Sequence, residues 1–143
     1  FGVSPRMRLD LLVNHFVHAA LTDGYIVLFE GHFKRNFIHI RDVADAFVHG
    51  IHNAQDMRDR PFNLGLDSAN MSKEDLASKI QEHVPGFFFT SSEQNSDPDQ
   101  RNYLVSNQRL REAGFEASRS IDVGIAELIA AHQMQPLSPM RNA

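Results

Sequence analysis

Histidine and arginine are the side chains whose spacing in this 143-residue sequence could support chemistry. Two histidine pairs stand three residues apart, His15 with His18 and His49 with His52. On a helix each pair would place two imidazoles on one face, an arrangement that suits a metal ion. No His-Glu-x-x-His motif accompanies either pair. We therefore interpret these histidines as exposed polar positions of amphipathic helices, and we keep a His-dependent metal-binding protein as an alternative.

Basic residues stand at several points where the chain is expected to enter a helix or strand. Arg6 and Arg8 precede the first expected helix, where free backbone amides and the helix dipole favour an anion. Lys34 and Arg35 precede a short extended run, and Arg101 ends a very polar stretch. If these side chains converge, they would form a pocket for a diphosphate, because guanidinium groups bind phosphate oxygens in pairs. Spacing alone also fits separate surface arginines balanced by nearby acids.

The composition excludes several classes of protein. No cysteine is present, which excludes disulfides, thiolate zinc sites and a cysteine nucleophile, and is consistent with a cytosolic protein. A net charge of −4 argues against general binding to nucleic acid or to anionic membranes. No apolar run approaches the roughly 20 residues that span a bilayer. The glycines are isolated, and neither a G-x-G-x-x-G loop nor a G-x-S-x-G elbow occurs.

The order of elements predicts a mixed α/β fold of about five helices and five short strands. Helices are expected at 8–22, from an N-cap at Asp42 to about 53, from Ser72 to 84 with an Asp75 capping box, at 107–113, and from Ser120 or Asp122 onward. Strands are expected at 25–29, 37–40, 62–66, 87–90 and 103–105. Helices separate the strands, which favours parallel wiring. Because the strands are few for a doubly wound sheet, we expect one lobe of a larger sheet protein, an interpretation that the opening Phe1 without an initiator methionine also favours.

Five segments in order resemble the C-terminal half of the NAD-dependent epimerase/dehydratase family, the extended short-chain dehydrogenases that act on nucleotide sugars. The strongest is residues 35–46, RNFIHIRDVADA, and it is joined by FGVSPRMRLD at 1–10, FNLG at 62–65, the segment from Asp99 to Phe115, and the closing helix at 120–129. The resemblance spans residues 1–134. We expect this range to be a substrate-binding lobe and 135–143 to be a frayed tail.

The resemblance implies a set of substrate-binding residues. Arg35 matches the family arginine that contacts the nucleotide diphosphate, and Arg8, Leu9 and Asn14 match the region where the family backbone meets the nucleotide. Arg101 is the second candidate phosphate contact, although the family arginine often lies further upstream, near Asp97 here. Two further matches, Asn63 and Asp42, are interpreted as structural: an amide that satisfies backbone groups, and a helix cap.

The resemblance also implies what the sequence does not contain. The family binds NAD through a glycine-rich loop near its start and carries a catalytic Tyr-x-x-x-Lys, whereas Tyr25 and Tyr103 have no lysine four residues on. We therefore expect no catalytic or cofactor-binding residues here, no turnover by the chain alone, and marginal stability with a large exposed apolar face.

The implied ligand is a nucleotide-diphosphate sugar, and the implied parent reaction is epimerisation or dehydration through transient oxidation of the sugar by NAD. A non-catalytic ligand-binding or partner-binding module is the main alternative. Family members are commonly dimers, which leaves a homodimer of the intact protein open.

Overall fold

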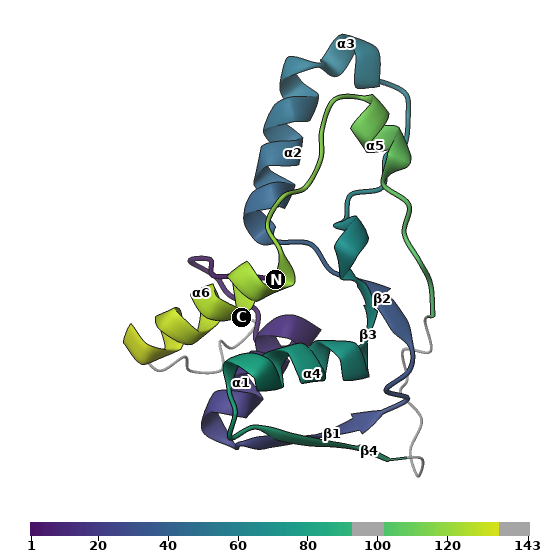
Figure 1. Cartoon of the computed structure of the whole chain (residues 1–143). Coiled ribbons are helices and arrows are strands. Elements are labelled where there is room, and N and C mark those ends of the chain that lie inside the picture. Colours follow the sequence, from purple (N-terminus) through teal and green to yellow (C-terminus); the bar gives the residue numbers. More distant parts are fainter. Residues whose placement is uncertain (93–101, 135–143) are drawn as a thin grey trace.

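The computed structural model describes residues 1–92 and 102–134, and it has the mixed α/β architecture that the sequence predicts (Figure 1). The described part contains six α-helices, a 3₁₀ turn and four strands. The helices are α1 (Leu12–Thr22), α2 (Ile40–His52), α3 (Ala54–Met57), α4 (Lys73–His83), α5 (Gln108–Glu112) and α6 (Ile121–Met134), and the 3₁₀ turn is η1 (Asp67–Ala69). The strands are β1 (Tyr25–Phe29), β2 (Lys34–Asn36), β3 (Asn70–Ser72) and β4 (Phe88–Ser92).

The strands form two separate pairs. β1 and β4 are parallel, with Tyr25 opposite Phe88, as the helix-separated strand order predicts. β2 and β3 are antiparallel, with Arg35 opposite Met71, so the prediction of parallel wiring is wrong for this pair. In Figure 1 the β1–β4 pair lies at one end of the molecule, and α2, α3 and α5 lie at the other.

Three expected strands, 37–40, 62–66 and 103–105, are not strands in the structure. Their backbone groups bond to other partners. The Phe1 carbonyl accepts from the Ile40 amide, while the Leu66 amide donates to the side chain of Asn36 and the Val105 amide to that of Asn70. Residues 37–39, 62–66 and 103–105 have no regular secondary structure, and Ile40 is the first residue of α2. The Phe37 amide donates to the Ala69 carbonyl and the Tyr103 amide to the Lys34 carbonyl, while side-chain amides and the N-terminal segment bond other backbone groups of these segments.

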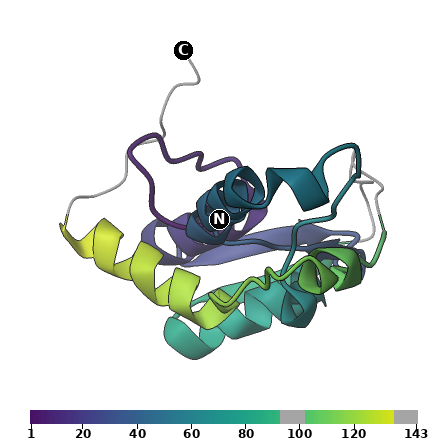
Figure 2. The ribbon, with the colours of Figure 1, turned by 90° about the horizontal axis from the view of Figure 1, so that it is seen from above.

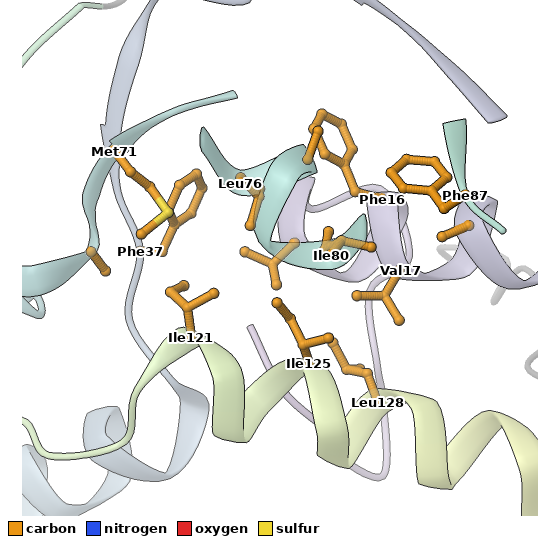
Figure 3. Close-up of a cluster of buried hydrophobic side chains, with 14 of the residues drawn as sticks. Phe16, Val17, Phe37, Met71, Leu76, Ile80, Phe87, Ile121, Ile125 and Leu128 are labelled. Atoms are coloured by element: carbon orange, nitrogen blue, oxygen red, sulfur yellow. The ribbon is translucent and has the colours of Figure 1, made fainter. Parts of the chain in front are cut away.

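A layer of α1, α4 and α6 holds the hydrophobic core (Figure 3). In Figure 2, α4 and α6 lie along the same side of the strands. Each helix contributes buried apolar side chains, and those of the cluster include Phe16, Val17, Leu76, Ile80, Phe87, Ile125 and Leu128. Burial of such side chains is the main stabilising contribution to a domain of this size.

Two helix caps were predicted from the sequence, and the structure confirms the cap of α4 but not that of α2. The capping box of α4 is confirmed: the Ser72 hydroxyl accepts from the Asp75 amide, and the Asp75 carboxylate accepts from the Ser72 amide. The predicted cap at Asp42 is wrong, because α2 begins at Ile40 and its N-cap is His39, three residues before Asp42. Asp42 lies instead in the first turn, buried, where its carboxylate accepts from the Arg119 backbone amide and guanidinium. The helix dipole favours a carboxylate there as well.

α2 differs from the core helices because its apolar side chains face outward. Phe47, Val48 and Ile51 are exposed, and a hollow of about 430 Å³ runs beside them, lined by apolar side chains from α2, α3 and residues 62–64. A sizeable exposed apolar surface is therefore present on α2. Within residues 1–92 and 102–134, no helix has both the length and the apolar character to cross a membrane. The predicted tail at 135–143 lies outside the described residues.

Candidate substrate-binding site

Arg35 is a buried cation at the centre of β2. Strand pairing with β3 fixes its backbone, and its side chain is only 6% exposed. The guanidinium donates to the Lys34 carbonyl at 3.1 Å and lies 5.8 Å from the centre of the Tyr103 ring. A cation over an aromatic face at this distance contributes about 0.5–2 kcal/mol. Because a buried charge is costly unless compensated, Arg35 is not an ordinary surface arginine.

Tyr103 reaches Arg35 because asparagines hold residues 102–107 against the strands. The Lys34 amide donates to the Asn102 side chain at 3.0 Å. The Asn70 side chain exchanges two hydrogen bonds with the backbone of Val105, at 2.9 and 3.0 Å, and the Asn63 amide donates to the Ser106 carbonyl. A segment without regular secondary structure is thereby fixed next to Arg35. The structural interpretation of Asn63, an amide that satisfies a backbone group, is confirmed.

Asn36, the residue after Arg35, makes the same kind of contact. Its side chain donates to the Leu66 carbonyl at 2.8 Å and accepts from the Leu66 amide at 3.2 Å. A Cβ atom on Gly65 would overlap the Asn36 amide. The glycine of the FNLG segment is therefore needed for close approach of this backbone to β2.

Arg8, Leu9 and Asn14 form a second group before and within α1. Asn14 is buried, and its side chain donates to the Arg8 carbonyl at 2.9 Å and accepts from the Gly2 amide at 3.1 Å. Leu9 packs against the core, while the Arg8 guanidinium is exposed and pairs with Asp10. The hydrogen bond and charge of Arg8 lower the pKa of Asp10. Asn14 thus positions the Arg8–Leu9 backbone, and the Arg8 side chain is already engaged.

The predicted substrate-binding residues do not line either of the two larger hollows of the described structure. The hollow of about 410 Å³ is lined by Pro61, Asn63, Ser106, Gln108, Arg109 and Glu112, and that of about 430 Å³ lies at α2, so neither includes Arg35, Arg8, Leu9 or Asn14. Arg101 lies outside the described residues. What the structure adds is Tyr103 as the partner of Arg35, and the asparagines that position it.

Sequence reasoning missed these asparagines, apart from Asn63. Their signal is visible afterwards: Asn36, Asn70 and Asn102 each flank a short extended run, where a side-chain amide can replace a strand partner. Nothing in the spacing shows which backbone each one meets, because their partners lie 30 to 68 residues away.

The histidines do not form a metal centre in the part of the chain that the structure describes, where no three acidic or histidine side chains are grouped to hold an ion. His15 and His52 are exposed, as predicted. The prediction is wrong for the other two. His49 bonds the Ala113 carbonyl at 2.8 Å, and His18 packs against His132.

Comparison with known proteins gives a consistent result. No family model matches the chain. Among solved structures, it is similar to TunA, an NAD-dependent NDP-hexosamine 5,6-dehydratase of tunicamycin biosynthesis, with 20% identity and a TM-score of 0.73 over 94% of this chain and 43% of that one. It is also similar to the UDP-N-acetylglucosamine 4-epimerase of Bacillus cereus, with 17% identity and a TM-score of 0.69 over 93% and 45%. A third is the GDP-mannoheptose C4 reductase of Campylobacter jejuni with NADP bound, with 16% identity and a TM-score of 0.71 over 93% and 46%.

These matches establish the fold. It is that of the C-terminal part of extended short-chain dehydrogenases, as the resemblance in sequence predicts. The chain spans less than half the length of the structures it matches. The neighbours are dehydratases, epimerases and reductases with nucleotide-sugar names, so they share a substrate class more clearly than a single reaction.

Proposed function

We propose that residues 1–134 are the nucleotide-sugar-binding lobe of an NAD-dependent epimerase or dehydratase. The observation that carries this proposal is Arg35, the residue that matches the family's diphosphate contact. It is a buried cation fixed by strand pairing and by Tyr103, not an arginine in bulk water. A pre-positioned guanidinium loses little entropy when it binds a phosphate, which favours affinity.

The Arg8–Leu9 segment is the second part of the proposed site. Asn14 holds its backbone, and Leu11, which precedes α1, has no side-chain oxygen to cap the helix. In this proposal the segment contacts the nucleotide through its backbone, and Arg101 adds a phosphate contact. The lobe would position the sugar and contribute no catalytic residue.

The described residues after β1 do not fit NAD. β1 leads through a turn at Glu30 into β2 rather than through a glycine-rich loop into a helix, so no cradle for the NAD pyrophosphate follows this strand. In our proposal NAD binds elsewhere in an intact enzyme, and the exposed apolar side of α2 packs against that part. A cytosolic location and a homodimer of the intact protein belong to the same proposal.

Calorimetric titration of the 143-residue chain with UDP and GDP tests the site. We expect a diphosphate to bind, and we expect Arg35→Ala to weaken binding at least tenfold, because truncating a charged hydrogen-bond donor costs about 2–5 kcal/mol. Arg35→Lys keeps the charge but not the planar fork, and should fall between the two. Arg60→Ala, an exposed arginine in the loop after α3, is the control and should bind as the wild type does.

Circular dichroism establishes that each variant is folded before titration. A folded wild-type chain that binds neither nucleotide, or equal binding by wild type and Arg35→Ala, would contradict the proposal. The first result would favour a non-catalytic module that retains only the fold.

A further inference from the structure

Two histidines meet where α1 packs against α6. The rings of His18 and His132 are edge-to-face, with their centres 5.9 Å apart. The Nδ1 atom of each ring is buried, and neither has a hydrogen-bond partner among the residues that the structure describes. A helix–helix contact thus contains two imidazole nitrogens that are shielded from water.

This geometry accommodates neutral rings and opposes charged ones. A neutral imidazole can carry its single proton on Nε2 and leave the buried Nδ1 bare. A protonated imidazole has an N–H on both nitrogens, so each Nδ1–H would be buried without an acceptor. Protonation of both rings would also place two positive charges side by side.

The pKa of His18 is lowered, as this geometry requires. Burial is the main cause. The charges of His132 and His15 lower the pKa further, while the charge of Asp23, just after α1, raises it. The two carboxylates of α6 are engaged elsewhere. On α6, Asp122 binds Lys79 and His83 of α4, and Glu127 binds His39 and Arg41.

We propose that the His18–His132 pair is an acid-sensitive latch that holds α6 against α1 while His18 is neutral and releases it when His18 is protonated next to His132. The unfolded chain takes up the His18 proton first, near the ordinary histidine pKa of about 6.5, because the folded chain lowers the pKa of His18. This contribution to stability is therefore complete above that pH and falls as the pH drops below it.

Release of α6 would reach the start of α2. Glu127 on α6 bonds His39 at 2.9 Å, and His39 is the N-cap of α2. Loosening of α6 would therefore remove a hydrogen-bond partner of the residue that begins α2. A drop in pH would thereby loosen the start of α2, the helix that carries the exposed apolar side chains.

Hydrogen exchange of the full 143-residue chain tests the latch. We expect the protection factors of α6 amides, corrected for intrinsic rates, to fall between about pH 7.5 and pH 5.5, by about tenfold for each unit by which the native state lowers the pKa of His18. His18→Gln cannot become charged, so its α6 protection should depend less on pH. His52→Gln removes an exposed histidine of α2 and should retain the wild-type dependence.

An NMR titration of the imidazole protons in the wild-type chain gives a second readout that does not depend on the variants folding. We expect His18 to titrate below the ordinary histidine pKa of about 6.5. Titration of His18 at or above that value, or an equal loss of α6 protection in wild type and His18→Gln, would overturn the proposal.

Discussion

The layer of α1, α4 and α6 and the region around β2 are stabilised in different ways. In the helical layer the contacts are apolar, made by side chains such as Leu76, Ile80 and Ile125 that are wholly buried. Around β2 the chain has little regular structure, and asparagine side chains bond backbone groups far away in sequence. The stability of the helical layer therefore depends on the area and packing of its buried apolar side chains, and the structure of the β2 region depends on individual hydrogen bonds.

The difference has a consequence for binding. Apolar contacts are non-directional, whereas a hydrogen bond to a given backbone group requires a short distance and a near-linear angle between its two partners. The segment that carries Tyr103 is held in the second way. We expect the helical layer to determine whether the chain folds, and the β2 region to determine whether the proposed site is formed.

The largest effect is expected from Ile125→Ala, in the helical layer. Ile125 on α6 has no exposed surface, so the variant loses buried methyl groups and leaves a cavity at a cost of about 2–5 kcal/mol. Val123, two residues earlier on the same helix, is 53% exposed, and Val123→Ala should change stability by less than about 1 kcal/mol. Chemical denaturation measures both, and a similar loss from the two variants would mean that α6 does not pack as described.

The helical layer is also the part that sequence predicts well. Apolar residues at helical spacing located all three helices, although α1 begins at Leu12 and not at residue 8 as predicted. The Ser72–Asp75 pair located the start of α4, because such signals depend only on residues a few positions apart. The closing helix was expected from Ser120 or Asp122 and begins at Ile121.

The β2 region was predicted less well for a physical reason. The sequence identified Arg35 through a motif, but it placed the strand at 37–40 instead of 34–36 and gave no sign that Tyr103 lies over Arg35. Apolar periodicity does not reveal a segment fixed by side-chain amides. His39 as a helix cap was missed for the same reason, since a histidine cap has no distinctive pattern.

A smaller effect is expected from Asn36→Ala, in the β2 region. The variant leaves the amide and carbonyl of Leu66 without their partner, which costs about 1–3 kcal/mol where such groups stay buried. Asn36→Asp keeps the acceptor for the Leu66 amide and loses the donor, so its stability should lie between those of Asn36→Ala and the wild type. Denaturation measures stability, and titration with UDP measures the site.

Binding and folding should respond differently to the Asn36 substitution. Asn36→Ala should impair UDP binding in chains that circular dichroism shows to be folded, because Asn36 adjoins Arg35. Unchanged affinity in a folded Asn36→Ala chain would show that the bonds around β2 do not control the proposed site.

The smallest effect on stability is expected from Phe47→Ala, on α2. α2 has an apolar stripe like those of the core helices, but Phe47 is 71% exposed, so its removal should change the free energy of unfolding by no more than about 0.5 kcal/mol. The variant should also bind less of the dye ANS, because one large ring is lost from the exposed apolar surface. A loss of stability as large as that of Ile125→Ala would mean that another surface covers Phe47 in solution. Sedimentation of both chains would then show whether that surface is a second copy, since Phe47→Ala would sediment as a lighter species than the wild type.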